Sequence, residues 1–290
     1  MSILIDRSSK VLVQGITGRE GAFHAEQMLA YHTQVVGGVT PGKGGQTVHG
    51  IPVFNTVREA VEQTGADTTV LFVPPLFTRQ GVMEALDAGV PQIITIAEHV
   101  PLHDMMNIMA CARGTGSRVI GPNSFGVISP GKAKAGFMAH RIFSEGPVAV
   151  MSRSATNCYE TVFMLTGRGF GQSTCIGIGG DMIPGSTFTD FLPMFEADDQ
   201  TKVIVLIGEI GGQEEEKAAA FIKAHVSKPV VALIAGKNAP KERSMGHAGA
   251  IVAPDGTGSA ENKEKVLRAA GVHLAESTMD IVEICAKLLV

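Results

Sequence analysis

Short apolar runs alternate with helix-like segments along this 290-residue chain, and this alternation restricts the fold more than any other feature. In the first half the runs are KVLVQG, TQVVGGV, DTTVLFVPP, PQIITIAE and SRVIGPNS, which begin at residues 10, 33, 67, 91 and 117. Runs rich in Val and Ile and bounded by Gly or Pro are typical of strands buried on both faces. Because such strands are joined through helices, we expect right-handed β–α–β units and a doubly wound parallel sheet.

A second series of the same kind follows, with the runs GPVAVMS, STCIGIGG, KVIVLIGEIGG and KPVVALIAGK. Between the two series, the Pro/Gly/Lys-rich stretch GPNSFGVISPGKAKAG (121–136) interrupts the alternation. The sequence therefore predicts an α/β protein of two doubly wound domains, 1–122 and 146–290, joined by a linker over 123–145. We expect the first domain to be Rossmann-like and the second to be flavodoxin-like.

Composition excludes several classes of protein. The net charge of −4 and the lack of like-charge blocks give no reason to expect a nucleic-acid partner. No apolar run approaches the roughly 18 residues that span a bilayer, and the N-terminal residues resemble neither a signal nor a transit peptide, so we expect no membrane partner and a cytoplasmic location. The cysteines are scattered without metal-ligand spacing, which indicates reduced, buried thiols and no metal site.

A first anion-binding turn is expected in QGITGREG (14–21), between the first strand and the first helix. Gly15, Gly18 and Gly21 allow the backbone to turn tightly and to approach an anion, and the helix N-terminus offers N–H groups and a partial positive charge. The spacing differs from the G-x-G-x-x-G fingerprint of dinucleotide-binding domains. A plain strand-to-helix turn is therefore the alternative.

The end of the second strand favours one kind of nucleotide. A NAD-binding domain carries a carboxylate there for the ribose hydroxyl groups, whereas this chain has VVGGVTPGKGG, with Lys43 in a glycine loop. A cation at that position suits a ribose that bears an extra phosphate. Coenzyme A fits this description; NADP fits by charge alone, and no hydride-transfer site is recognisable elsewhere in the chain.

A second anion site is expected at MSRSATNCYE (151–160), where a strand ends and a helix begins near Ser154, Ala155 and Thr156. Ser154 is alternatively a nucleophile, although its neighbours do not form G-x-S-x-G. Glu209, in LIGEIGG, ends another buried strand. Its carboxylate is placed either to orient an imidazole or to cap a helix.

His247 lies in SMGHAGAIV, among glycines and alanines that leave its ring mobile. A helix N-terminus would stabilise a phosphoryl group carried on this ring, and a glutamate would determine its tautomer. A phosphohistidine relay is the functional interpretation, and a purely structural histidine is the alternative.

Several of these segments closely resemble the α subunit of succinyl-CoA synthetase, over nearly the whole chain: GGVTPGKGG, PVFNTVREAV, GFGQSTC, GIGGD, LIGEIGG and above all MGHAGAI. The resemblance implies an N-terminal CoA-binding domain and a C-terminal phosphohistidine domain. It also implies an ATP-grasp β subunit that binds ATP or GTP with Mg²⁺ and phosphorylates His247. The phosphoryl group then passes to a small carboxylic acid, and the CoA thiol attacks the acyl phosphate.

The resemblance also assigns roles to residues of this chain. Glu209 would hydrogen-bond His247, and Tyr159 would lie at the acid site. The residues implied to contact CoA are Thr17, Gly18, Arg19, Glu20, Lys43, Ile96, Ala97 and Glu98.

Departures from the family pattern cluster near the expected acid site. Ser124-Phe125 replaces Cys-Pro, Ala155-Thr156-Asn157 replaces Gly-Thr-Leu, and Arg141 replaces a histidine. Arg141 and Asn157 add donors that suit a second anionic or polar group on the acid, with neutral drift as the alternative.

Succinate is the default acid, and sulfoacetate, malate and citrate are alternatives. A non-catalytic CoA-binding regulator and an NADP oxidoreductase are rival functions, and the choice between αβ and α2β2 assemblies stays open.

Overall fold

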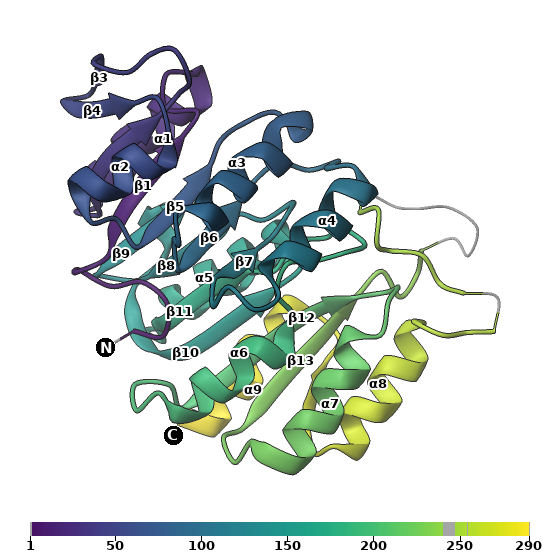
Figure 1. The fold of residues 1–290 in the computed structure, drawn as a ribbon. Coiled ribbons are helices and arrows are strands. Elements are labelled where there is room, and N and C mark those ends of the chain that lie inside the picture. The colour runs from purple at the N-terminus through teal and green to yellow at the C-terminus, as the bar shows by residue number, and fades with distance from the viewer. Residues whose placement is uncertain (1, 240–246, 254, 290) are drawn as a thin grey trace. The chain divides into compact units, whose positions relative to one another are not determined.

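The computed structural model describes residues 2–239, 247–253 and 255–289 and has the expected α/β class (Figure 1). The chain divides into two compact units. The N-terminal unit comprises Leu4–Met138 with Ile183–Ser186, and the C-terminal unit comprises Ala139–Met182 and Thr187–Val290 with Met1–Ile3. Each unit contains its own sheet of predominantly parallel strands, as the sequence predicts.

The sheet of the N-terminal unit has the strand order β3-β4-β2-β1-β5-β6-β7, with only the short β3 antiparallel among its described pairs. Its strands are β1 (Lys10–Gln14), β2 (Gln34–Val39), β3 (Thr47–Val48), β4 (Ile51–Phe54), β5 (Thr68–Leu71), β6 (Gln92–Thr95) and β7 (Arg118–Ile120). The helices are α1 (Arg19–Ala30), α2 (Val57–Thr64), α3 (Pro75–Asp87) and α4 (Leu102–Ala112). Helices α2, α3 and α4 pack side by side, and Leu12, Val82, Ile93 and Met105 fill the core beneath them.

The stretch expected to be a linker, 123–145, contains regular structure. An antiparallel hairpin of β8 (Gly126–Ser129) and β9 (Ala133–Gly136) follows β7, and a 3-10 helix, η1, spans His140–Ile142. The hairpin residues are buried, and β9 packs on α1 within the N-terminal unit. Gly and Pro indicate turns, but they do not show whether the segments between the turns pair with each other. For this reason the sequence predicted an irregular linker where the structure has a hairpin.

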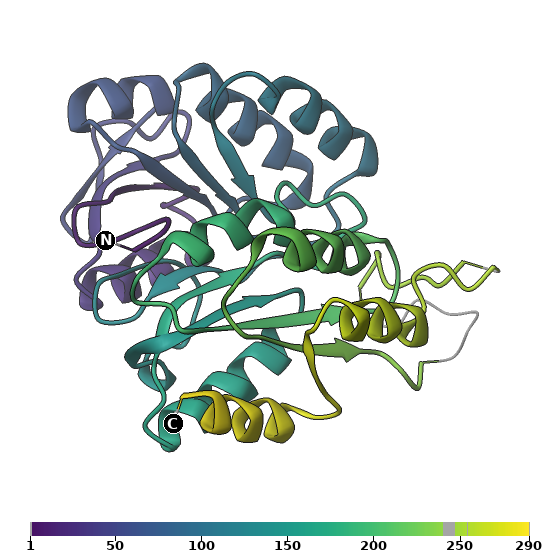
Figure 2. The ribbon, with the colours of Figure 1, turned by 90° about the horizontal axis from the view of Figure 1, so that it is seen from below.

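The strands of the C-terminal unit pair in parallel in the order β14-β13-β12-β10-β11. They are β10 (Glu145–Ser152), β11 (Gln172–Gly177), β12 (Val203–Glu209), β13 (Val230–Ala235) and β14 (His273–Ala275). The helices are α5 (Ala155–Gly167), α6 (Phe188–Ala197), α7 (Glu214–His225), α8 (Ala260–Ala269) and α9 (Thr278–Leu289). Helices α6, α7 and α8 cover one face of this sheet, and α5 and α9 pack together on the other (Figure 2).

The thiols follow the sequence-based expectation except at one position. Cys158, Cys175 and Cys285 are buried and reduced, whereas Cys111 is reduced but exposed near the end of α4, so the prediction of burial is wrong for that residue. No helix in the described ranges combines the length and the apolar character needed to cross a membrane.

Candidate active site

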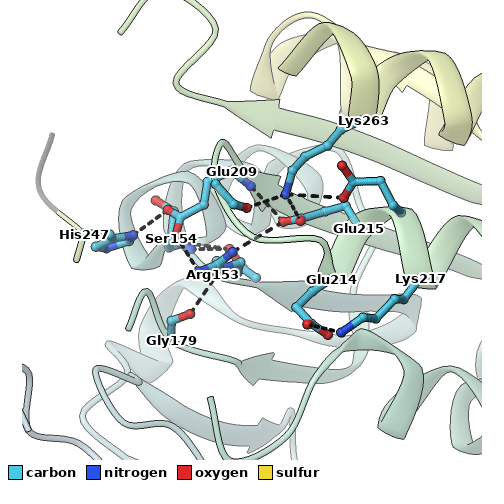
Figure 3. Close-up of polar contacts among 12 residues, drawn as sticks. Arg153, Ser154, Gly179, Glu209, Glu214, Glu215, Lys217, His247 and Lys263 are labelled. Atoms are coloured by element: carbon cyan, nitrogen blue, oxygen red, sulfur yellow. Dashed lines mark hydrogen bonds and ion pairs between the residues drawn. The ribbon is translucent and has the colours of Figure 1, made fainter. Parts of the chain in front are cut away.

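The polar residues singled out in the second half of the sequence meet at the carboxyl edge of the C-terminal sheet. β10 lies between β11 and β12, and the chain leaves β10 toward β11 and then returns to β12, so the winding direction reverses there. Ligands of doubly wound proteins bind at such a reversal. Arg153 and Ser154 follow β10, Glu209 ends β12, and His247 comes from the segment after β13 (Figure 3).

His247 and Glu209 form the central contact of this site. Nδ1 of His247 lies 2.5 Å from Oε2 of Glu209, which is buried at the end of β12, while the imidazole ring is 27% exposed. The carboxylate thus contacts an imidazole rather than a helix terminus. Because an ionised carboxylate only accepts hydrogen bonds, Nδ1 carries the proton and the ring lone pair lies on Nε2.

The surrounding charges shift the pKa of His247 in opposing directions. The hydrogen bond with Glu209 raises this pKa above its ordinary value and is the largest contribution; burial and the Arg153 guanidinium lower the pKa, and Asp181 raises it further. Protonation would remove the lone pair at Nε2. Nucleophilic attack by this ring should therefore slow as the pH falls below the raised pKa.

Arg153 is a buried member of the site that the sequence analysis did not single out. Its Nη2 lies 3.0 Å from Oε1 of Glu209, and its Nε donates to the carbonyl of Gly179 at 3.4 Å. The side chain is only 5% exposed. The available signal was an arginine directly after a strand whose second half is buried, since a charge at that position is expensive to bury without a partner.

Small residues allow the histidine segment to lie against the strand ends. Gly249 donates its N–H to the carbonyl of Gly180 at 3.1 Å, and an added Cβ at Gly249 would lie 2.8 Å from Nη2 of Arg153. An added Cβ at Gly180 would lie well inside 3.0 Å of the His247 ring. The residues just before His247 in MGHAGAI lie outside the described residues, so the swinging motion expected of this loop stays a prediction.

Helix α5 begins next to Glu209, as the order of the strands requires. Ser154 is its N-cap, and its hydroxyl accepts a hydrogen bond from the N–H of Asn157 at 3.3 Å. This contact fits a capping role better than a nucleophilic one. Ala155 and Thr156 form the first turn, so their N–H groups and the helix dipole lie at the carboxyl edge of the sheet, where an anion is stabilised.

The residues expected near the acid gather around the same helix. Tyr159 lies on α5, where burial raises the pKa of its hydroxyl and keeps it neutral, and its ring packs edge-on against Phe143 at a centroid distance of 6.3 Å. The 3-10 helix η1, which carries the exposed Arg141, packs on α5. Arg141, Asn157 and Tyr159 therefore belong to one structural neighbourhood, although the structure shows no direct contact that joins all three.

The glycine turn of the N-terminal unit lies at the corresponding reversal of its sheet, between β1 and β5. Gly15 has a φ of +77°, and a Cβ there would lie 2.5 Å from the Phe72 carbonyl oxygen of the loop after β5. A side chain at Gly21 would collide with the carbonyl of Gly15. The turn thus requires glycine at both positions, and α1 starts directly after its N-cap, Gly18.

The other residues expected at the N-terminal site follow neighbouring strands. Since parallel strands end at the same edge of a sheet, the loops after β1, β2 and β6 share that edge. Thr17 bonds Thr40 through their hydroxyl oxygens at 3.2 Å, and the side chain of Arg19 is 96% exposed. The remaining residues at this edge are Glu20 on α1, Lys43 in the exposed loop after β2, and Ile96, Ala97 and Glu98 after β6.

The part of the chain that the structure describes contains no group of His, Cys, Asp and Glu side chains arranged to hold a metal ion. At the C-terminal site, Glu209 instead contacts both Arg153 and His247.

Two family models match the chain, one in its N-terminal part and one in its C-terminal part. A CoA binding domain matches residues 6–99, and a CoA-ligase domain matches residues 151–273. The succinate–CoA ligase [ADP-forming] subunit alpha 1 of Archaeoglobus fulgidus is 52% identical over 100% of this chain and 99% of its own length. The corresponding alpha subunit of Aquifex aeolicus is 50% identical over 100% of this chain and 95% of its own.

A solved structure extends the likeness to three dimensions. ATP citrate lyase from Methanothrix soehngenii, in complex with citrate and coenzyme A, superimposes with a TM-score of 0.89 at 26% identity. The match covers 98% of this chain, which spans 50% of the length of that enzyme. With the family models and the full-length relatives, these findings show that the chain belongs to the succinate–CoA ligase α-subunit family.

Proposed function

We propose that this chain, assembled with a β subunit, makes an acyl-CoA from a small dianionic acid, coenzyme A and a nucleoside triphosphate through a phosphohistidine at His247. The observation that carries the proposal is the contact between Nδ1 of His247 and the buried Glu209 carboxylate. This contact places the lone pair on Nε2, the nitrogen that then attacks phosphorus. The dipole of α5 begins beside Glu209 and stabilises the transferred group.

The chemistry explains why a carrier histidine is useful. A carboxylate does not react with a thiol at neutral pH, so one of its oxygens must first become part of a leaving phosphate. His247 Nε2 bonds to the terminal phosphorus of the nucleotide as the nucleoside diphosphate leaves. A carboxylate oxygen of the acid then takes the phosphoryl group and regenerates the imidazole. Attack of the CoA sulfur on the acyl carbon finally releases inorganic phosphate.

The partner requirement follows from what the two units offer. Their family models describe a CoA binding domain and a CoA-ligase domain. We therefore expect another polypeptide to bind the nucleotide. We infer an ATP-grasp β subunit that binds the nucleotide with Mg²⁺. The relatives carry the description ADP-forming, which favours ATP over GTP.

We infer that the N-terminal unit binds CoA at the edge formed by the loops after β1, β2 and β6. The glycine turn before α1 receives the pyrophosphate, and Lys43 pairs with the 3′-phosphate. The matching family model covers this whole edge of the sheet.

The test of the proposal is the position and stability of a transferred phosphoryl group. The αβ complex is incubated with γ-labelled ATP without acid or CoA, and we expect label that is lost in acid, is retained in base and maps to His247. Addition of succinate and CoA should discharge the label. If label is absent, or is acid-stable on a hydroxyl such as Ser154, the proposal is wrong.

Succinate is the acid that we propose, and the substitutions near α5 define a second candidate. Arg141 and Asn157 would suit sulfoacetate, malate or citrate, and the solved relative that binds citrate shares the fold over 98% of this chain. We expect kcat/KM of the αβ complex to be highest for succinate. Because Arg141 is exposed, the substitution Arg141→His should change the kcat/KM for succinate by no more than about threefold. If kcat/KM is tenfold higher for one of the other acids than for succinate, that acid is the substrate and the proposal of succinate is wrong.

A further inference from the structure

Behind Glu209, on the side away from His247, two oppositely charged residues are completely buried. Lys263 of α8 and Glu215 of α7 have fully buried side chains that contact each other through Nζ and Oε2 (Figure 3). Lysine and glutamate are almost never fully buried unless they are paired. A buried ion pair is nevertheless weak evidence for stability, since apolar residues of the same volume often serve as well. This pair therefore calls for an explanation beyond packing.

The pair continues as a series of alternating charges that ends at His247. Oε1 of Glu215 lies 3.8 Å from Nη1 of Arg153 and accepts a hydrogen bond from the N–H of Glu209 at 3.1 Å. Arg153 in turn lies 3.0 Å from the Glu209 carboxylate, which holds the imidazole. Glu215 thus contacts both the backbone of Glu209 and the cation that balances its side chain.

Lys263 also reaches the backbone that supports the histidine segment. Its Nζ donates to the carbonyl of Gly211 at 2.6 Å. Gly211 has a φ of +87°, and its α carbon lies so close to the carbonyl of Gly249 that a Cβ would collide with it. Gly249 comes two residues after His247, so Lys263 restrains both the partner of the imidazole and the turn on which its segment lies.

Four residues of this cluster carry two charges of each sign. Lys263 and Arg153 supply two cations, and Glu215 and Glu209 supply two anions, all at least nine-tenths buried. Glu216 on α7 adds a carboxylate to this cluster, because its buried Oε2 lies 3.7 Å from Lys263, whereas Glu214 pairs with Lys217 at the surface. Toward the imidazole itself the charged groups are Glu209, Arg153 and Asp181. Removal of one buried charge therefore changes the net charge beside Arg153 and Glu209 by one unit.

We propose that Lys263 and Glu215 are positioning residues for the phosphorylation of His247: they hold Arg153 against Glu209 and thereby determine how strongly Glu209 holds the imidazole. The inference rests on the proposed function of His247. Without Lys263, Glu215 draws Arg153 toward itself, and Glu209 attracts the imidazole proton more strongly. Without the charge of Glu215, Arg153 neutralises Glu209 more completely, and the imidazole loses its proton more readily.

Two single substitutions should therefore shift the pH profile of phosphorylation in opposite directions. For Lys263→Met in the αβ complex, we expect the acid midpoint of the phosphorylation rate to rise by about half a pH unit or more, because one buried cation is lost. For Glu215→Gln, which keeps an oxygen for the N–H of Glu209, we expect the midpoint to fall by about as much. The double variant Lys263→Met/Glu215→Gln restores the charge balance and should return the midpoint close to that of the wild type.

Lys237→Met is the matched control, because Lys237 forms comparable ion pairs with Glu264 and Glu276 but at the surface of the same unit. Its midpoint should equal that of the wild type. A parallel NMR titration of the His247 ring in the full-length chain, assigned with His247→Asn, measures the same shifts without any activity. If Lys263→Met does not fold, Glu215→Gln alone carries the test.

The outcomes separate the two proposals. If wild-type His247 takes up no phosphate, the proposed function is wrong. If it is phosphorylated but both single variants keep the wild-type midpoint, or shift it in the same direction, Lys263 and Glu215 serve only stability and this inference is overturned. A fall in Tm with unchanged midpoints counts against it in the same way.

Discussion

Replacement of His247 by asparagine is expected to reduce thioester synthesis by the αβ complex about 10⁴-fold or more, as loss of an enzymatic nucleophile does. The asparagine amide can still donate a hydrogen bond to Glu209 from a position near that of Nδ1, so the buried charges beyond Glu209 keep their partner. What disappears is Nε2, the atom that bonds to phosphorus. The Tm should therefore stay within a few degrees of the wild-type value while the label from ATP disappears.

The control for this substitution is His225→Asn at the exposed end of α7, where the ring packs beside Phe221. Its rate of thioester synthesis should equal that of the wild type. Should His247→Asn retain a tenth of the wild-type rate, the acid would have to be activated without a carrier histidine.

A single methyl group at Gly180 is expected to slow phosphorylation of His247 about 100-fold, because a misplacement of about 1 Å near reacting groups can have an effect of that size. The Cβ of alanine would lie well inside 3.0 Å of Cγ and Nδ1 of His247. Gly180 is not among the glycines with a positive φ and lies in a bend after β11, so we expect the added methyl group to displace the ring rather than the backbone. The movement separates Nδ1 from Glu209 and displaces Nε2 from the end of α5.

Gly167→Ala provides the matched control, since no atom lies within 4 Å of the position of its added Cβ at the end of α5. Phosphorylation rates are measured in single turnover for both variants, with Tm measured in parallel. We expect Gly180→Ala to lose rate with little loss of Tm and Gly167→Ala to lose neither. Equal rates for the two would mean that the ring position in the structure is not the one that reacts.

Much of the fold was predictable because buried parallel strands and their helices have distinct sequence patterns. KVLVQ is apolar between its terminal Lys and Gln, VIVLIGE is apolar up to its final glutamate, and both are central strands of their sheets. The hairpin of β8 and β9 was not predicted, since Gly131 and its neighbours indicate a turn but do not reveal a pairing partner. Strands as short as β3 and β14 carry too few residues to show an alternation.

The candidate site was predictable only in part. His247 and Glu209 stood out because a histidine among glycines and a carboxylate at a strand end are both unusual, and the structure brings them into contact. Arg153 and Lys263 did not stand out, because a basic residue in a helix or at a strand end usually reaches solvent. Their burial depends on which segments pack over them, and that is not encoded within any short window of sequence.

Sequence alone determined the order of the longer strands and most helices, the glycine turn before α1 and the choice of His247 as the candidate phosphate carrier. Each of these depends on residues close together in the chain. Only the tertiary structure decided which charges face one another. Arg153, Glu209, Glu215 and Lys263 are separated by up to 110 residues, yet they form one cluster of alternating charges. Strand order places them together, and the cost of burying a charge without a partner then keeps each beside its opposite.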